Sequence, residues 1–288
     1  MVKIDFAAYA RQVATENGEL AMLPVIEKEL LHYEILRAMG DSGLLSNIVF
    51  QGGTCLRLCY GAERYSEDLD FAGGADFAAT DLDDLKNCIT RALPERYAVE
   101  TRVVEPKKTA GLVKKWSIRI NTTPERPDLP TQKIKLEVAA IPAYTKQAQM
   151  LQLNYRGLPS SYADVIVFAE RLEEILADKL LAFVCSANVR YRDIWDMYWI
   201  ARRPYLDKKE ACRLRKKKET DYGEQETFAQ GMARITDQLE ELVNGVEFRA
   251  QMKRFLPLDI HERTVDRAEF RMVLCQGVRE LYALCDQI

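Results

Sequence analysis

The chain has 288 residues, of which 48% are hydrophobic and 30% are charged, so it has room for one large domain or two modest ones. No segment approaches the roughly 18 uncharged apolar residues of a membrane span, and the N-terminal residues are too polar for a signal peptide, which together predict a cytoplasmic protein with no membrane contact. The formal net charge is −3, so only local basic patches could bind a nucleic acid.

The first half of the chain alternates helical and β-rich segments. Residues 19–39 have apolar side chains at i, i+3 and i+4, and residues 81–93 open with acidic residues that suit the N-terminus of a helix. This half is predicted to form a mixed sheet with flanking helices. The segments with the β-branched or alternating pattern of strands are 48–51, 68–72, 97–104, 115–121 and 133–139.

The second half has the apolar periodicity of helices from about Glu170 to the C-terminus, which predicts a helical bundle. The segment 154–164 is rich in Gly, Pro and Ser and marks a boundary. We therefore predict an α+β fold, with a sheet domain and N-terminal helices in residues 1–160 and a mainly helical domain in residues 161–288. The charged run 213–219 is interpreted as a solvated helix face and not as a binding patch.

The cysteines and histidines do not indicate metal or redox chemistry. Seven cysteines at scattered positions form no C-x-x-C pair, which predicts reduced thiols in the core. The histidines, His32 and His261, leave few options for histidine-based catalysis, and both are interpreted as structural.

The segment 48–60 follows the pattern of a strand, a glycine turn and a helix. Gly52 and Gly53 allow the backbone to approach a ligand closely, and the free N–H groups at the start of the helix favour a phosphate. Many α/β proteins turn in this way without a ligand, and the spacings of a P-loop and of G-x-G-x-x-G are absent. The turn by itself is therefore a weak indication of a nucleotide site.

Asp68 and Asp70 lie in a predicted strand, where side chains at i and i+2 share one face. The two carboxylates therefore lie side by side, while Leu69 and Phe71 point toward the core. Their repulsion costs free energy unless a cation sits between them, and hard oxygen ligands in this arrangement suit Mg²⁺ that also binds nucleotide phosphates. A polar strand edge facing solvent is the alternative, which the glycine turn upstream makes less favourable.

Glu137 occupies the same alternation on a later strand, where the apolar residues of 134–138 point to the core. It would complete a metal-binding trio with the two aspartates if the two strands are neighbours. It could instead pair with Lys133 or Lys135 at the surface.

Residues 52–71, GGTCLRLCYGAERYSEDLDF, resemble the signature of the AbiEii/AbiGii toxin family of bacterial nucleotidyltransferases, within the polymerase-β-like nucleotidyltransferase superfamily. The family pattern is roughly a Gly-Gly-Thr turn, Leu-Arg-Leu, then Arg-x-Ser-x-Asp-x-Asp-Phe. The resemblance implies a nucleotidyltransferase-like sheet, a nucleotide bound at the turn, and catalytic aspartates that hold Mg²⁺ or Mn²⁺. The residues that fill the pattern are Gly52, Gly53, Thr54, Leu56, Arg57, Leu58, Arg64, Ser66, Asp68, Asp70 and Phe71, and the nucleotide-binding ones among them are Gly52, Gly53, Thr54, Arg64 and Ser66.

The segments EEILADKLLAF and YRDIWDMYWI of the second half are similar to later motifs of the same family. The resemblance makes Lys179 a contact of the nucleotide phosphates and Asp193 a catalytic acid that contacts the nucleotide or the attacking group, while Asp196 orients its neighbours. If the two helices dock across the carboxylate edge of the sheet, Lys179 and Asp193 reach the same cleft as the two aspartates. The residues alone favour a solvated lysine for Lys179, and for Asp193 an acid of the first helical turn paired with Arg190 or Arg192.

The resemblance implies an enzyme that transfers a nucleotide from a nucleoside triphosphate (NTP) to an acceptor hydroxyl, which in some members of the family is the 3′ end of tRNA. It further implies a toxin of a type IV toxin–antitoxin pair or of abortive infection against phage, with a separately encoded antitoxin. Basic groups suited to an RNA backbone are Lys107, Lys108, Lys114, Lys115 and the run 213–218.

Three alternatives stay open: an antibiotic-modifying nucleotidyltransferase, a protein-modifying one, and a nucleotide-binding module without turnover. Such a module has no reason to keep the repulsion between Asp68 and Asp70. An antibiotic-modifying enzyme needs an acidic pocket for a cationic substrate, and the lysines of 107–115 and 213–218 argue mildly against one.

Overall fold

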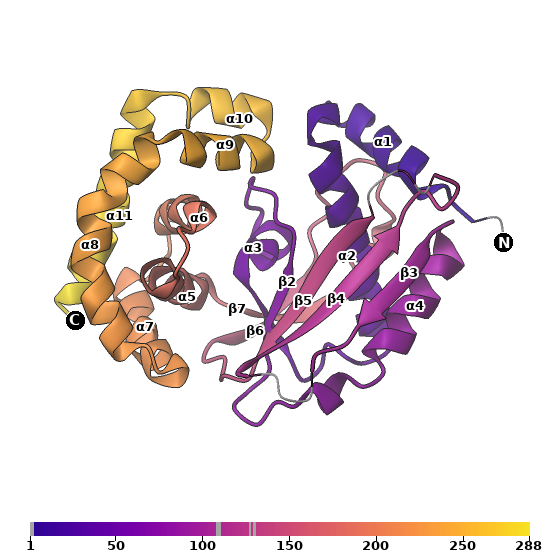
Figure 1. Cartoon of the computed structure of the whole chain (residues 1–288), viewed down its shortest axis with the longest axis horizontal. Helices are drawn as coiled ribbons and strands as arrows, with labels where there is room; N and C mark the ends of the chain where they lie inside the picture. The colour runs from indigo at the N-terminus through magenta and orange to yellow at the C-terminus, as the bar shows by residue number, and fades with distance from the viewer. Residues whose placement is uncertain (1–2, 108–110, 127, 129–130) are drawn as a thin grey trace. The chain divides into compact units, whose positions relative to one another are not determined.

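The computed structural model describes residues 3–107, 111–126, 128 and 131–288, without the side chains of 233–236, and divides into two compact units (Figure 1). Unit 1 spans Met1–Ala169 and unit 2 spans Glu170–Ile288. The division falls at the end of the last strand of the sheet, whereas the sequence pattern places the boundary between residues 160 and 161.

Unit 1 begins with helix α1 (Phe6–Glu16), which Asp5 caps by accepting a hydrogen bond from the Ala8 amide at 3.0 Å. The predicted helix over 19–39 is present as η1 (Leu20–Met22) followed by α2 (Leu23–Asp41), which has proline in its first turn. The other helical segments of unit 1 are α3 (Gly52–Tyr60), η2 (Ala79–Leu82), α4 (Leu85–Arg96) and η3 (Ser160–Tyr162).

Within the described residues, seven strands form one sheet in the order β3-β4-β5-β2-β1-β7-β6. β2 runs parallel to β5 and β1 parallel to β7, whereas the pairs β1/β2, β3/β4 and β4/β5 are antiparallel. This confirms the predicted α+β fold with a mixed sheet and flanking helices, although β6 and β7 have no counterpart among the predicted strands. The bounds are β1 (Val49–Gln51), β2 (Leu69–Ala72), β3 (Glu100–Val104), β4 (Val113–Asn121), β5 (Gln132–Ala139), β6 (Lys146–Met150) and β7 (Ile166–Glu170).

Alternation along the strands separates a buried face of the sheet from a charged face. In β5 the side chains of Ile134, Leu136 and Val138 are fully buried, while Lys133 and Lys135 are exposed, as predicted. Helix α4 packs on β3, and α2 packs on α4 (Figure 1). The opposite, charged face carries the predicted carboxylates.

Beyond Glu170, unit 2 is helical, as the sequence predicts. Helices α5 and α11 both pack against α6, α7 and α8. No helix in the described part of the chain is long and apolar enough to cross a membrane. The helices are α5 (Leu172–Cys185), α6 (Tyr191–Ala201), α7 (Lys208–Tyr222), α8 (Gln225–Asn244), α9 (Val246–Phe255), α10 (Leu258–Arg263) and α11 (Ala268–Asp286).

Two cysteines of unit 2 correct the prediction of reduced thiols. Cys212 and Cys285 form a disulfide that joins α7 to α11, with their Cα atoms 5.0 Å apart. They are separated by 73 residues, so no local sequence pattern could indicate the pair. The free cysteines of the described residues are Cys55, Cys59, Cys88, Cys185 and Cys275.

The interpretation of 213–219 as a solvated helix face is wrong in part, because Arg215 and Lys218 are only 4% and 0% exposed. Both lie on the side of α7 that faces the other helices of the unit. Burial lowers the pKa of Lys218, but three carboxylates outweigh it and raise the pKa above its ordinary value. Lys218 Nζ lies 3.0 Å from Glu170, 2.8 Å from Glu174 and 3.5 Å from Asp178.

Candidate functional site

The glycine turn between β1 and α3 gathers several of the predicted site residues. Gly52 has φ +77, and a Cβ atom built there would lie 2.7 Å from Asp70 Oδ2. A Cβ atom on Gly53 would lie 2.6 Å from Arg64 Nη2 and 2.8 Å from Ser66 Oγ. A side chain at either glycine would displace these polar groups, because Asp70, Arg64 and Ser66 converge on the start of the helix.

Buried polar contacts hold the segment that leads into β2 against α3. Thr54 is 1% exposed, and its hydroxyl donates a hydrogen bond to the backbone carbonyl of Asp68. Arg64 is 2% exposed and donates from Nη1 to the carbonyl of Tyr65 at 2.5 Å, while Ser66 is 8% exposed. These contacts fix the direction in which the polypeptide enters the strand that carries the carboxylates.

The register of the sheet places the predicted carboxylates on one face. Asp70 lies opposite Gln51 of β1 and opposite Glu137 of β5. The strands that carry Asp70 and Glu137 are therefore neighbours, which is the condition for a metal-binding trio in the sequence analysis. Leu69 and Phe71 are 0% and 1% exposed, which confirms that they point to the core. Gln51, Asp70 and Glu137 therefore form a polar row across three strands.

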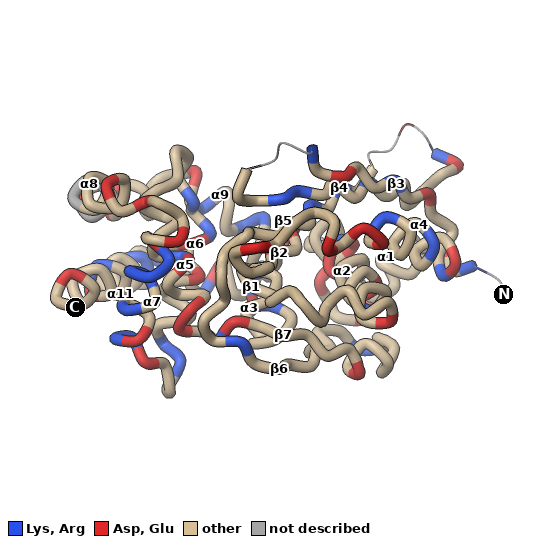
Figure 2. The backbone as a smooth tube through the Cα atoms, turned by 90° about the horizontal axis from the view of Figure 1, so that it is seen from below, with Lys and Arg blue, Asp and Glu red and all other residues tan. Residues whose placement is uncertain are grey.

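Lysines from the same face pair with two of the carboxylates. Lys135 Nζ lies 3.5 Å from Asp68 Oδ2, and Lys115 Nζ lies 3.1 Å from Glu137 Oε2. Figure 2 shows basic stretches of β4 and β5 beside the acidic stretch of β2. The lysines offset the repulsion between the acids, and the partner of Glu137 comes from β4 and not from its own strand.

The carboxylates fit a divalent cation in their chemistry, but they are not gathered as a finished site. Asp68, Asp70 and Glu137 supply the hard oxygen ligands that Mg²⁺ and Mn²⁺ prefer. Among the described residues, however, no three His, Cys, Asp or Glu side chains come close enough together to hold a metal ion. A metal at this face would require at least one lysine to release its carboxylate, and both lysines are about half exposed, with 61% for Lys115 and 47% for Lys135.

Arg57 of α3 connects the helix that follows the glycine turn to α2 and to the segment after α3. Its Nε lies 2.9 Å from Glu29 Oε2 of α2, and its Nη1 donates to the carbonyls of Ala62 at 3.2 Å and Glu63 at 3.1 Å. Its guanidinium also stacks on the ring of Tyr65 at 4.3 Å. Burial lowers the pKa of Arg57, but Glu29 outweighs it and raises the pKa, so the guanidinium stays charged. Glu29 was not predicted, although an acid among the apolar positions of a helix is the signal that could have indicated it.

The two histidines have structural contacts. His32 Nε2 lies 3.0 Å from the carbonyl of Glu67, and burial lowers the pKa of His32 to about 4, so the ring is neutral near pH 7. His261 Nδ1 lies 3.1 Å from Asp266, and its Nε2 lies 3.2 Å from the carbonyl of Arg249.

In unit 2 the structure brings together Lys179 of α5 with Asp193 and Asp196 of α6. Lys179 Nζ lies 2.7 Å from Asp193 Oδ1 and 3.1 Å from Asp196 Oδ2, and the three residues are 7%, 2% and 2% exposed. Burial raises the pKa of Asp193, but Lys179 and Arg190 outweigh it and lower the pKa to about 2. Lys179 is therefore a buried ion-pair partner and not the solvated lysine that the sequence allowed.

The basic residues proposed for RNA have different surroundings. Lys107 is exposed, Lys114 donates to the carbonyl of Gly111 at 2.9 Å, and Lys108 lies outside the described residues. In the run 213–218, only Arg213, Lys216 and Lys217 are exposed, so it forms a weaker basic patch than the sequence suggests.

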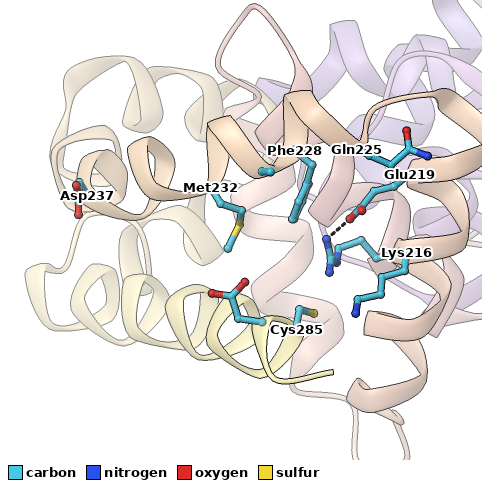
Figure 3. A pocket seen from close by; sticks show the side chains of 10 residues that line it. Lys216, Glu219, Gln225, Phe228, Met232, Asp237 and Cys285 are labelled. Atoms are coloured by element: carbon cyan, nitrogen blue, oxygen red, sulfur yellow. Dashed lines mark hydrogen bonds and ion pairs between the residues drawn. The ribbon is translucent and has the colours of Figure 1, made fainter.

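A pocket of about 670 Å³ in unit 2 lies among α7, α8 and α11 (Figure 3). The guanidinium of Arg215 stacks on Phe228 at 4.1 Å and pairs with Glu219 beside it. The pocket contains none of the residues predicted to bind the nucleotide.

Residues 34–274 match the model of a family described as nucleotidyl transferase AbiEii toxin, type IV TA system. Among solved structures, the protein JHP933 of Helicobacter pylori is 20% identical, with 91% of this chain and 90% of that chain covered and a TM-score of 0.48. A second H. pylori structure, described as a "putative nucleotidyltransferase", is 19% identical, with 91% and 93% covered and a TM-score of 0.49. No curated protein matches the sequence. The family match includes every predicted site residue from Gly52 to Asp193.

Proposed function

Because the chain belongs to the AbiEii family of nucleotidyl transferase toxins from type IV toxin–antitoxin systems, we propose that it transfers a nucleotide from an NTP to the hydroxyl of an acceptor. The observation that carries the proposal is the convergence of Arg64, Ser66 and Asp70 on the Gly52-Gly53 turn. A guanidinium, a hydroxyl and helical N–H groups around one turn suit a triphosphate.

The turn binds the nucleotide in this proposal. The phosphates lie over Gly52, Gly53 and Thr54, and Arg64 and Ser66 contact them from the segment that leads into β2. The polar ends of these two side chains are the atoms nearest to a Cβ atom built on Gly53, so hydrogen-bond donors border the turn.

The carboxylates of the charged face hold the cation. Asp68 and Asp70 are the proposed ligands of Mg²⁺ or Mn²⁺, and Glu137 is a third because it lies in register with Asp70. When bound, the cation neutralises charge on the triphosphate and on the departing pyrophosphate. With the carboxylates engaged by a cation, Lys115 and Lys135, which pair with Glu137 and Asp68 in the structure, would be available for phosphate groups.

The reaction is an in-line substitution at the α-phosphorus. The acceptor oxygen forms a bond to that phosphorus, the bond to the bridging oxygen breaks, and pyrophosphate and the hydroxyl proton are released. Lys179 contacts the leaving phosphates, and Asp193 contacts the nucleotide or the attacking hydroxyl. Asp196 orients these two side chains. For this role the ammonium of Lys179 exchanges part of its contact with the two carboxylates for phosphate oxygens.

The proposed acceptor is the 3′ end of tRNA in the cytoplasm, and its modification stops growth as part of a toxin–antitoxin or phage-defence response. The separately encoded antitoxin of the family is the proposed protein partner.

The test incubates the full chain with each of the four labelled NTPs, Mg²⁺, and either total bacterial RNA or total protein. Label in the tRNA fraction, lost in the variant Asp70→Asn, supports the proposal. Label in protein favours the protein-modifying alternative, and no label in any macromolecule contradicts transfer to a macromolecular acceptor. The antitoxin is tested separately, by whether co-expression of a separately encoded antitoxin restores growth.

A further inference from the structure

Three basic side chains lie in register across three neighbouring strands on the charged face of the sheet. Arg102 of β3 lies opposite Arg119 of β4, and Arg119 lies opposite Lys133 of β5. All three are exposed, whereas the residues that alternate with them in β4 and β5 are buried. We call these three residues the basic ladder.

Without a bound anion, the repulsion within the basic ladder destabilises the folded protein. Like charges directly opposite each other on neighbouring strands destabilise a sheet. In the part of the chain that the structure describes, none of the three side chains forms an ion pair or a side-chain hydrogen bond. Lys115 and Lys135, the neighbouring lysines on the same face, each pair with a carboxylate of the site. The ladder therefore keeps three positive charges together without a negative partner of its own.

The ladder and the carboxylate row lie on the same face of the same strand. Lys133, Lys135 and Glu137 alternate along β5 with the buried residues. At about 3.3 Å per residue, Lys133 lies about 13 Å from Glu137 along the strand. With strands about 4.8 Å apart, the ladder extends about 10 Å from Lys133 to Arg102.

We propose that Arg102, Arg119 and Lys133 bind the phosphate backbone of a nucleic-acid acceptor behind its reacting end. This proposal rests on the proposed function, which places the reacting hydroxyl at the carboxylate row. A row of regularly spaced cations matches a regular polyanion, and the planar guanidinium groups of the two arginines suit phosphate oxygens. A small drug or a single protein hydroxyl has no charges at this distance to occupy the ladder. The contacts are to phosphates, so they position the strand without reading its sequence.

The test compares two triple variants of the full chain. The ladder variant is Arg102→Gln, Arg119→Gln and Lys133→Gln. The control variant is Lys3→Gln, Arg11→Gln and Arg91→Gln, which removes the same charge from exposed residues of the same unit that lie outside the sheet face. For each protein, label transfer to RNA is measured against acceptor concentration at several salt concentrations, and NTP affinity is measured by calorimetry.

In the ladder variant we expect the KM for RNA to rise about tenfold or more relative to the control, with kcat at saturating RNA changed much less. Loss of three phosphate contacts should also reduce the slope of log affinity against log salt by about 2, since each single-strand contact contributes about 0.7. NTP affinity should equal that of the control. The charge-retaining variant Arg119→Lys should keep most of the affinity for RNA.

The outcomes separate this proposal from the proposed function. If the native chain labels RNA and the ladder variant has the same KM and salt slope as the control, the basic ladder is only a solvated surface and the proposal is wrong, while the proposed function stands. If the native chain labels protein or nothing, the proposed tRNA acceptor is wrong, and the ladder proposal is wrong with it because it requires a nucleic-acid acceptor. An unchanged or slightly raised melting temperature of the ladder variant shows that it is folded, because the substitutions remove repulsion.

Discussion

Two clusters of charged side chains differ in how deeply their ion pairs are buried and in how closely the paired charges approach. On the sheet of unit 1, Asp68 and Lys135 are 28% and 47% exposed and lie 3.5 Å apart. Between α5 and α6 of unit 2, the side chains of Asp193 and Lys179 are 3% and 9% exposed, and their charged atoms lie 2.7 Å apart. An exposed ion pair contributes at most about 1 kcal/mol, whereas removing one partner of a buried pair costs about 3–5 kcal/mol.

The difference shows what each cluster can do. The pairs on the sheet can open at little cost, so their carboxylates are available to a cation and their lysines to phosphates. The pair between the helices is part of the packing of unit 2, and any role in catalysis must be compatible with that structural role. Substitutions that affect the two clusters separately test this comparison.

The largest effect is expected for Asp70→Asn. It removes a negative charge from the Gln51, Asp70 and Glu137 row while keeping the size of the side chain, so transfer should fall about 10³-fold, or roughly 4 kcal/mol. The melting temperature should not fall, because one member of a like-charge group is neutralised. Activity is measured with labelled NTP beside a thermal melt. Transfer that persists in this variant would remove Asp70 from the cation site.

The second expected effect concerns Lys179→Met, compared with Lys135→Met as the exposed control. Lys179→Met leaves Asp193 and Asp196 buried without their shared cation, and it should destabilise the protein by about 3 kcal/mol, the lower end of the range because Arg190 still contacts Asp193. Lys135→Met should change stability by less than about 1 kcal/mol. Urea unfolding measures both. If the two variants lose equal stability, the contrast between the clusters is wrong.

Activity measurements on the same two variants sharpen the assignment of Lys179. If Lys179 contacts phosphates, transfer per folded molecule falls strongly even at a temperature where the variant is fully folded. If transfer per folded molecule is unchanged, Lys179 acts only in the packing of α5 on α6, and its proposed catalytic role is withdrawn.

The third expected effect compares Gly52→Ala with Gly74→Ala. Both glycines have positive φ, +77 and +86, so each substitution carries about 1 kcal/mol of backbone strain. Gly74 has no atom within 4 Å of the new Cβ atom, whereas at Gly52 the carboxylate of Asp70 must move away. Gly52→Ala should therefore cost about 1–2 kcal/mol more and should also weaken NTP binding with Mg²⁺. Equal stability and affinity in the two variants would show that the approach of Gly52 to Asp70 has no role.

The sequence predicted the parts of this architecture that depend on local pattern. The alternation over 133–139 placed Glu137 on the side of its strand that faces away from the core. The structure adds that this strand is a neighbour of β2 and that Glu137 lies opposite Asp70. β6 was missed because KQAQM has no β-branched residue, and its strand conformation depends on pairing within the sheet. The catalytic and ligand roles of the site residues stay predictions, because they depend on a bound nucleotide.

Long-range pairing explains the other differences. Lys218 appears in a run of charges that resembles a solvated helix face, and only the fold brings Glu170 and Glu174 to it. The disulfide between Cys212 and Cys285 has the same origin, since neither residue has a local partner. A buried charge or a distant cysteine pair is determined by packing between elements, which a single sequence does not show.

The last expected effect is a dependence of stability on pH that comes from His32, whose ring contacts the residue before Asp68. Burial lowers its pKa to about 4, and this outweighs the nearby carboxylates of Glu29 and Asp68, which raise it. In the unfolded chain the pKa is about 6.5, so between these values the unfolded state binds more protons and stability falls as pH falls.

From pH 7 to pH 5, this linkage should lower the free energy of unfolding by about 2 kcal/mol, and most of the loss occurs below about pH 6.5. Urea unfolding at both pH values measures it, and His32→Gln should lose less stability over the same interval, because glutamine does not titrate. The same slope in His32→Gln as in the native chain would mean that other groups, and not the histidine that contacts the carbonyl of Glu67, cause the loss.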